Sequence, residues 1–403
     1  MDFKTLNTRL SFMSALRNLL DNSTVSYYKN VLSSQTIEDF ANNYAKLCNN
    51  LYITGDACKS ICNDILCDHN ALTDNLDTPN NELMDSVTND LQTISCLLSL
   101  KTEDFFDYMR TAFAETSLDL SVMPKLLKSS SLPFSNANDL LNYYKQNGYG
   151  FFAKANSFTV TENGEIIAVP CPDKTTLNDL KGYEIQRSKV ITNTLSFINK
   201  KPANNILLYG DKGTGKSSTV KAVAHDYAHM GLKIVELSPR QIYVFPKLCE
   251  LASKSPYRII VFMDDLSFDR EDENFAILKA FIEGGLTGKP ENVLLYATSN
   301  RRHLIRESFS ERQGDDIHVR DTLETITSLS DRFGLEITFS VPDKDEYLYI
   351  VDELAESYGL DIEKDKLNML AERFALRRNG RSPRTAQQFI RHIITEIENN
   401  GAI

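Results

Sequence analysis

The chain contains fewer basic than acidic residues, and no stretch of it concentrates positive charge. Its 403 residues include 44 lysines and arginines against 55 aspartates and glutamates, and the formal net charge is -11. Residues 1–150 hold 11 of these basic and 18 of these acidic side chains. Without a basic tail or stripe, strong sequence-independent binding to nucleic acid is not expected, although local basic patches are compatible with this composition.

Long hydrophobic runs and CxxC pairs are also missing. No window reaches the roughly 18 apolar residues that a membrane-spanning helix requires, and the first residues lack the pattern of a secretory leader. We therefore expect a cytoplasmic protein with reduced thiols and no membrane partner. Cys58, Cys62 and Cys67, followed by His69, suggest either a metal site or packed thiols. Their spacing, with Cys58 and Cys62 on one helical face, favours packed thiols.

The length of the chain exceeds one ordinary hydrophobic core and predicts several domains. Residues 1–148 show helical periodicity interrupted by polar connectors, and we expect an α-helical region there that recognises a partner. One apolar stripe at helical spacing consists of Leu10, Met13, Leu16, Leu19 and Leu20. Residues 149–174 contain β-rich runs on either side of Asn163 and Gly164, a dipeptide typical of tight hairpins, and are predicted to form a β-hairpin connector.

From residue 175 onward, short apolar runs alternate with segments of helical length. The five runs are "NNILLYG", "LKIVELS", "RIIVFMDD", "NVLLYATSN" and "LEITFSVPD". This alternation predicts an α/β domain over residues 175–342, with a doubly wound parallel sheet covered on both faces. Three amphipathic helical stretches follow in residues 343–403 and predict a small helical lid, whose third helix is expected to begin at Ser382-Pro383.

The stretch "LLYGDKGTGKSSTV", residues 207–220, contains the pattern G-x-x-x-x-G-K-[ST] between an apolar strand and a helical segment. Glycines there let backbone N–H groups approach phosphate oxygens at a helix N-terminus. Lys216 is expected to face the β- and γ-phosphates of ATP, and the Ser217 hydroxyl to bind Mg²⁺. The predicted phosphate-binding residues are Gly210, Asp211, Lys212, Gly213, Thr214, Gly215, Lys216, Ser217 and Ser218. A chance Gly-rich turn is the alternative, which the flanking strand and helix disfavour.

Polar residues end two later apolar runs. "RIIVFMDD" ends in Asp264 and Asp265, which suit a carboxylate on the Mg²⁺ shell and a second one that orients or deprotonates the attacking water. A solvated acidic turn is the alternative. "NVLLYATSN" ends in Asn300, at the edge of the sheet where ligands of open α/β sheets bind, and its amide can contact the γ-phosphate or a water molecule. Taken alone, Asn300 could equally begin a turn.

These segments resemble an AAA+ ATPase, and more specifically the bacterial ATP-binding family known as domain of unknown function 815. The resemblance covers about residues 175–395 and includes "PANNILLYGDKGTGKSSTVKA", "IIVFMDDLSF", "LKAFIEGGL", "ENVLLYATSNRRHLIRE", "SLSDRFGLEITF" and "RSPRTAQQFI". It implies that Arg332 is the arginine finger, Arg384 the sensor-2 arginine of the lid, and Asn300 sensor 1. Residues 177–186 resemble the segment that packs near adenine. The chain departs from the pattern at Asp265, where Glu is commoner, and at Pro383, where Gly is expected.

The expected function is ATP hydrolysis with Mg²⁺ by a homo-oligomer, most simply a hexameric ring, that remodels or loads an unidentified protein or nucleic-acid client. An ATP-dependent binding switch or loader with little turnover is the alternative. A kinase-like phosphotransferase fits less well with the asparagine sensor, the "DRF" arginine and the lid. "QIYVFPKL", residues 241–248, occupies the place of an aromatic pore loop in substrate-threading relatives, but Pro246 and the lack of Gly favour core packing.

Overall fold

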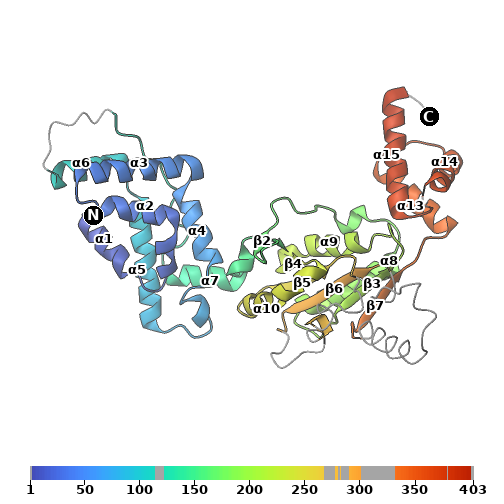
Figure 1. Ribbon diagram of the computed structural model, residues 1–403, viewed down its shortest axis with the longest axis horizontal. Coiled ribbons are helices and arrows are strands. Elements are labelled where there is room, and N and C mark those ends of the chain that lie inside the picture. The colour runs from blue at the N-terminus through green and yellow to red at the C-terminus, as the bar shows by residue number, and fades with distance from the viewer. Residues whose placement is uncertain are drawn as a thin grey trace, which may run out of the picture. The chain divides into compact units, whose positions relative to one another are not determined.

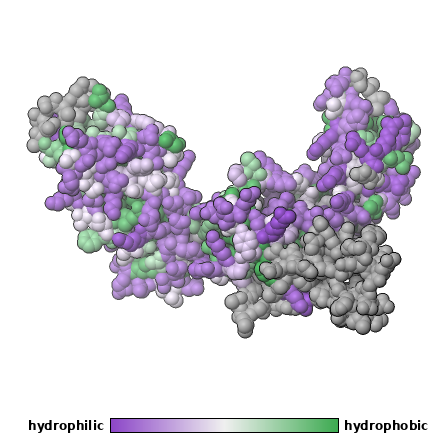
Figure 2. All heavy atoms as spheres, in the orientation of Figure 1, coloured by the Kyte–Doolittle hydropathy of each residue, from purple (hydrophilic) through white to green (hydrophobic). Residues whose placement is uncertain are grey.

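The chain forms two units, Met1–Lys154 and Ala155–Ile403 (Figure 1). The computed structural model describes residues 2–113, 122–266, 277–279, 282, 290–300, 332–378 and 380–400. Residues 301–331 and most of residues 267–289, which carry part of the family resemblance, lie outside the described residues. Within the described ranges, no helix combines the length and apolarity that a membrane crossing requires. Figure 2 shows a mainly hydrophilic face with small, scattered hydrophobic patches.

The first unit is α-helical, as the sequence predicts. Its helices are α1 (Phe3–Phe12), α2 (Ser23–Leu32), α3 (Ile37–Thr54), α4 (Ala57–Cys67), α5 (Asn81–Leu98), α6 (Thr102–Ala112) and α7 (Ala137–Asn147). Short polar side chains cap several of them: Asn22 accepts hydrogen bonds from the first backbone N–H groups of α2, and Asp56 and Asn136 do the same for α4 and α7. Such caps satisfy amide groups that have no partner within the helix, so they fix where each helix begins.

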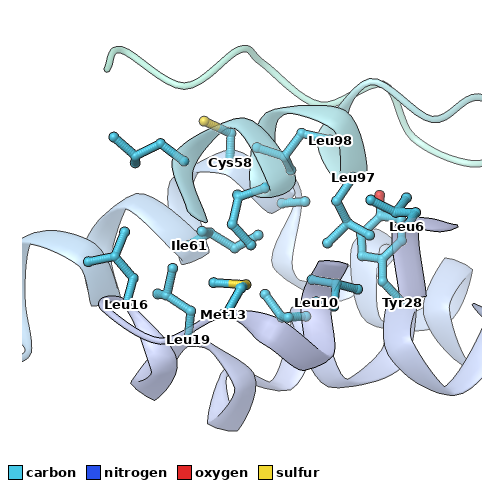
Figure 3. Packing of buried hydrophobic residues seen from close by; sticks show 14 of the residues in the cluster. Leu6, Leu10, Met13, Leu16, Leu19, Tyr28, Cys58, Ile61, Leu97 and Leu98 are labelled. Atoms are coloured by element: carbon cyan, nitrogen blue, oxygen red, sulfur yellow. The ribbon is translucent and has the colours of Figure 1, made fainter. Parts of the chain in front are cut away.

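The helices of this unit enclose one hydrophobic core, and Cys58 is part of it (Figure 3). Figure 3 shows Cys58 near Ile61 and Leu98, among aliphatic side chains. Its Sγ lies 3.6 Å from the Sγ of Cys62. Burial raises the pKa of the Cys62 thiol to about 12, so this thiol stays neutral at physiological pH. The structure therefore places Cys58 as a packed apolar residue.

The apolar stripe predicted near the N-terminus does not form one continuous helix, which corrects the prediction from helical periodicity. Helix α1 ends at Phe12, yet four of the five stripe residues are buried. The backbone N–H groups of Ser14, Ala15 and Leu16 donate to the carboxylate of Asp90 on α5, at 3.2, 2.9 and 2.9 Å. A tertiary acceptor thus takes the amide groups that a continuing helix would have used.

The second unit is centred on a seven-stranded sheet in the order β2-β1-β4-β5-β6-β3-β7 (Figure 1). Its strands are β1 (Ser157–Val160), β2 (Ile166–Ala168), β3 (Ile206–Gly210), β4 (Leu232–Glu236), β5 (Arg258–Met263), β6 (Val293–Ser299) and β7 (Leu335–Phe339). The five predicted apolar runs form β3 to β7, and these strands pair in parallel. The predicted α/β fold with a parallel sheet is confirmed.

The predicted hairpin is present as β1 and β2, which pair antiparallel around Gly164 at φ 78°. It also joins the sheet, because β1 pairs in parallel with β4. This second pairing cannot be read from the sequence. The backbone donors and acceptors at an exposed strand edge are the same whatever the side chains, so they do not indicate which strand will pair there.

Segment 241–248 lies beside the hairpin, in a 3₁₀ turn (Pro239–Val244) followed by α10 (Phe245–Ser253). Ile242, Val244 and Phe245 are buried, which confirms the predicted core packing of this segment, while the side chain of Tyr243 is 53% exposed.

Apolar residues on both faces of the sheet are buried. Helices α8 (Glu184–Ile198) and α9 (Lys216–Asp226) pack on one face, where Val190 and Val220 meet strand residues such as Ile260. Strand β6 is buried along all seven residues, so it reads as a continuous apolar run.

Three further helices form the predicted lid: α13 (Lys344–Ser357), α14 (Lys364–Arg377) and α15 (Pro383–Asn400). They share a separate hydrophobic cluster that includes Tyr347, Ile350, Val351 and Leu354 of α13, which recur at helical spacing.

Candidate nucleotide-binding site

The Gly-rich turn connects β3 to α9 and has a backbone that only glycine adopts easily. Gly210, Gly213 and Gly215 have φ values of 137°, 80° and 91°. A Cβ atom on Gly210 would lie 2.1 Å from the carbonyl oxygen of Phe339 on the neighbouring strand β7. Side chains are excluded there by both conformation and space, and the turn directs the first N–H groups of α9 outward at the end of the sheet.

Lys216, the first residue of α9, is buried with its ammonium group on the turn itself. Its Nζ donates to the carbonyl oxygens of Gly210 at 2.9 Å and Asp211 at 2.7 Å, and lies 3.4 Å from Oδ1 of Asn300. Burial lowers the pKa of Lys216, and the nearby acidic groups, led by Asp211, act in the opposite direction. The ammonium group is thus held within reach of both the turn and the end of β6.

Ser217, Asp264 and Thr298 converge beside this lysine from α9, β5 and β6. The hydroxyl groups of Ser217 and Thr298 both donate to Oδ1 of Asp264, each at 2.5 Å. Oxygen ligands of Mg²⁺ at 2.0–2.1 Å occupy adjacent octahedral positions about 3 Å apart, so the Ser217 and Asp264 oxygens fit such a pair with a small shift. These two residues would hold the ion that the sequence predicts, with Thr298 orienting the carboxylate.

Asp265 and Asn300 meet on the same edge of the sheet. Asp265 has a left-handed backbone with φ 52°, and its N–H donates to the Thr298 hydroxyl at 2.9 Å. The Asn300 amide donates to Oδ1 of Asp265 at 2.5 Å. A non-glycine residue in this conformation is uncommon and is typical of functional positions.

A cleft of about 360 Å³ collects these groups. Its walls are formed by Leu180, Lys212, Gly213, Gly215, Lys216, Ser217, Ser218, Asp264, Asp265, Thr298, Asn300, Pro383, Arg384 and Gln387. It therefore brings cationic side chains and carboxylates to one place, an arrangement that suits an anionic ligand together with a cation.

A second, narrower pocket adjoins the cleft. It is lined mainly by apolar groups from residues 180–183, β7 and the lid, among them Tyr183, Phe339 and Ile350. It shares Leu180, Gly215, Pro383 and Gln387 with the cleft. At about 30 Å³ this pocket has room for little more than a water molecule, so a flat apolar group attached to a phosphate chain in the cleft would enter it only with a shift of the lid. It includes part of segment 177–186, which the family resemblance places near adenine.

The lid contacts the Gly-rich turn through the start of α15. The N–H of Arg384 donates to the carbonyl oxygen of Gly213 at 3.3 Å, and Ser382 caps the helix by accepting from the N–H of Thr385. Arg381 forms two hydrogen bonds of 2.9 and 2.8 Å with Glu372, whose pKa is lowered by this contact. These bonds fix the turn that presents Arg384 to the cleft.

The cleft contains most, but not all, of the residues predicted from sequence. Gly210, Asp211 and Thr214 lie outside its walls, and the Asp211 carboxylate instead accepts a hydrogen bond from the N–H of Val341. Arg332 lies before the start of β7, whereas the cleft lies at the carboxyl ends of the strands. In the parallel pair of β3 and β7, Leu335 is opposite Ile206 at the start of β3, and Phe339 is opposite Gly210 at the P-loop end. Four consecutive steps along a strand span about 13 Å.

The sequence prediction missed Thr298 and Gln387, whereas Leu180 belongs to segment 177–186, which the resemblance placed near adenine. Thr298 could have been found, because it lies at the carboxyl end of β6, two residues before Asn300, where ligands of open α/β sheets bind. Gln387 carries no comparable signal, since an isolated Gln fits any helix or turn.

The parallel strands, with β3 and the Gly-rich turn that follows it (the P-loop) between β6 and β7, and the helices on the sheet form an α/β fold of the nucleotide-binding type. Residues 153–397 match the family described as "Protein of unknown function (DUF815)", and the chain belongs to this family.

Solved structures similar to this chain include Thermotoga maritima RuvB, titled a Holliday junction branch migration motor. It is 16% identical, with a TM-score of 0.40 over 57% of this chain and 67% of that chain. A variant of the same protein is 16% identical, with a TM-score of 0.41 over 58% and 69% of the two chains. A comparison with curated protein sequences found no match.

Proposed function

We propose that this protein is a cytoplasmic AAA+ ATPase that binds ATP with Mg²⁺, hydrolyses it, and uses the cycle to remodel or load a protein or nucleic-acid client. The observation that carries the proposal is the convergence of Lys216, Ser217, Asp264 and Thr298 on one cleft beside a P-loop. A chance Gly-rich turn would not place a metal-type carboxylate within hydrogen-bonding distance of the P-loop serine.

Each residue of the cleft has a role in this proposal. Lys216 and the N–H groups of the turn bind the β- and γ-phosphates, and Arg384 faces them from the lid. Mg²⁺, when bound, neutralises charge that develops on the phosphates. Asp265 orients the attacking water and accepts its proton, while Asn300 holds that carboxylate in place.

A binding switch with little turnover is the second candidate. It is favoured by the contact between Asn300 and Asp265, because an amide bound to the carboxylate competes with water for it. Asp265 is also shorter than the glutamate that is commoner at this position. Steady-state turnover separates the two functions: a remodelling motor accelerates when its client is added, whereas a switch completes about one cycle per binding event.

The proposal is tested with Lys216→Ala and Asp265→Asn, with Lys221→Ala as a matched control on the same helix. Lys216→Ala is expected to weaken ATP binding by about 100-fold or more, because a buried cation facing the phosphates is lost. Asp265→Asn is expected to keep its ATP affinity while hydrolysis falls by about 100-fold, since the lost group acts on water. Isothermal titration and phosphate release are the measurements. Equal loss of binding in both variants would contradict these roles.

A further inference from the structure

The linker between β7 and the lid is bonded to the nucleotide site at three consecutive residues. Phe339 ends β7, and Ser340, Val341 and Pro342 lead to α13. The carbonyl oxygen of Phe339, the carbonyl oxygen of Ser340 and the N–H of Val341 each take part in a hydrogen bond with Asp211 or Tyr183. This short segment is the covalent connection between the sheet and the lid.

Asp211 holds the linker from the side of the P-loop. Its N–H donates to the carbonyl oxygen of Phe339 at 3.0 Å, and its carboxylate accepts from the N–H of Val341 at 3.1 Å. The side chain lies outside the walls of both the cleft and the apolar pocket. The carboxylate of a P-loop residue is therefore directed at the lid linker.

Tyr183 holds the linker from the side of the apolar pocket. Its hydroxyl donates to the carbonyl oxygen of Ser340 at 2.5 Å, and its ring stacks on Phe339 with centroids 5.1 Å apart. Burial raises the pKa of the Tyr183 hydroxyl, so it remains a protonated donor. The residue adopts a left-handed backbone with φ 59°, a strained conformation for tyrosine that surrounding contacts must maintain.

The linker leads to Arg384 through packed helices. Ile350 of α13 contacts Gly182, where a Cβ atom would lie 2.7 Å from its Cδ1. Helices α13 and α15 share the lid core, which includes Ile350 and Ile390. The start of α15 then meets Gly213 through the N–H of Arg384. A shift of the linker would therefore move Arg384 relative to the phosphate-binding turn.

We propose that Asp211 and Tyr183 are positioning residues that fix the lid linker, so that Arg384 can reach a phosphate bound in the cleft. This inference rests on the proposed function, because it assigns the two residues an effect on ATP affinity that passes through the lid. For Asp211 the direction of the effect is diagnostic. Acting only through its charge, the carboxylate would repel phosphate, and its removal would tighten ATP binding; acting through the linker, its removal weakens binding.

A double-mutant cycle tests the proposal on the full chain, with a fluorescent ATP analogue as the probe. Asp211→Ala is expected to weaken binding by about three- to tenfold in the presence of Arg384 and to have little further effect in the Arg384→Ala background. Asp211→Asn keeps an oxygen that can accept from Val341 and is expected to lose less affinity than Asp211→Ala. A second cycle combines Tyr183→Phe, which keeps the ring stack but removes the hydroxyl, with Arg384→Ala.

The outcomes separate the two levels of the argument. Tighter binding by Asp211→Ala, or losses that add fully to that of Arg384→Ala in both cycles, would overturn the positioning role while leaving the ATPase proposal intact. If the wild-type chain binds no ATP analogue, the proposed function fails and the positioning role fails with it.

Discussion

At the scale of single residues, Thr298 links the two acidic positions of the site. Its hydroxyl donates to Asp264 and accepts from the N–H of Asp265, and its side chain is 2% exposed. One buried hydroxyl thus orients the carboxylate proposed to bind Mg²⁺ and the backbone of the residue proposed to act on water. Groups that orient metal ligands in this way commonly change metal affinity by 10- to 100-fold when removed.

We predict that Thr298→Val, which keeps the side-chain shape, weakens ATP binding by about tenfold in the presence of Mg²⁺ and leaves it unchanged in EDTA. The reason is that only the Mg²⁺-dependent part of binding involves the Asp264 carboxylate. Isothermal titration in both buffers is the measurement. Thr298→Ser restores a hydroxyl and serves as the control. An equal loss in EDTA would show that Thr298 supports the fold of the P-loop edge and not the metal site.

At the scale of secondary-structure elements, Asp90 determines where α1 ends. Asp90 is 4% exposed, and its carboxylate accepts hydrogen bonds from three backbone N–H groups of the segment that follows the helix. Removing a buried acceptor leaves its donors without a partner, at a cost of about 1–3 kcal/mol for each buried group.

Asp90→Ala is therefore expected to destabilise the first unit by about 3 kcal/mol. Hydrogen–deuterium exchange can localise the effect: amides of α1 and α5 should exchange faster, while those of β3 to β6 should not change. Asp85→Ala, an exposed position on the same helix, is the matched control. Faster exchange throughout both units would argue that Asp90 has a wider role than ending α1.

At the scale of the whole molecule, the position of Arg332 bears on assembly. Parallel pairing of β3 with β7 puts the P-loop and the start of β7 at opposite edges of the sheet. Arg332 therefore lies far from the cleft of its own chain and, as an arginine finger, would have to serve the cleft of a neighbouring copy. Heterologous contacts of this kind close into rings when the rotation between subunits permits.

We predict that Arg332→Ala and Lys216→Ala are each inactive alone but regain ATPase activity when mixed. Mixed assemblies place an intact P-loop next to an intact arginine at some interfaces, and a finger supplied in trans is worth about 10³ to 10⁵ in rate. Phosphate release at several mixing ratios is the measurement. Arg332→Lys keeps the positive charge but lacks the planar guanidinium group, so it should restore little of the ATPase activity lost in Arg332→Ala. Wild-type hydrolysis by Arg332→Ala alone would refute a finger at this position.

A second prediction at this scale concerns the division of labour between the two units. All residues of the cleft belong to Ala155–Ile403, and the hairpin that begins at Ser157 is part of the sheet. A fragment of residues 155–403 is therefore expected to bind ATP with unchanged affinity and to lose client recognition. A fragment that is folded by circular dichroism but does not bind ATP would contradict this division.

The sequence by itself determined the P-loop, the five parallel strands and the lid helices, because each follows from local chemistry. Glycines at fixed spacing, apolar runs of strand length and the Ser382-Pro383 helix start act within a few residues of the chain. The pairing of Ser217 with Asp264 was also predictable, since both follow parallel strands and must meet at one edge of the sheet.

Only the tertiary structure decided the features that depend on residues far apart in the chain. Asp90 binds backbone N–H groups 74 to 76 residues away and so ends a helix that the apolar stripe would continue. The hairpin joins the sheet because β1 pairs with β4. The Asp211 carboxylate contacts the lid linker 130 residues on. A carboxylate or a strand edge can satisfy many partners equally well, so the choice is made by whichever group the folded chain brings within hydrogen-bonding distance.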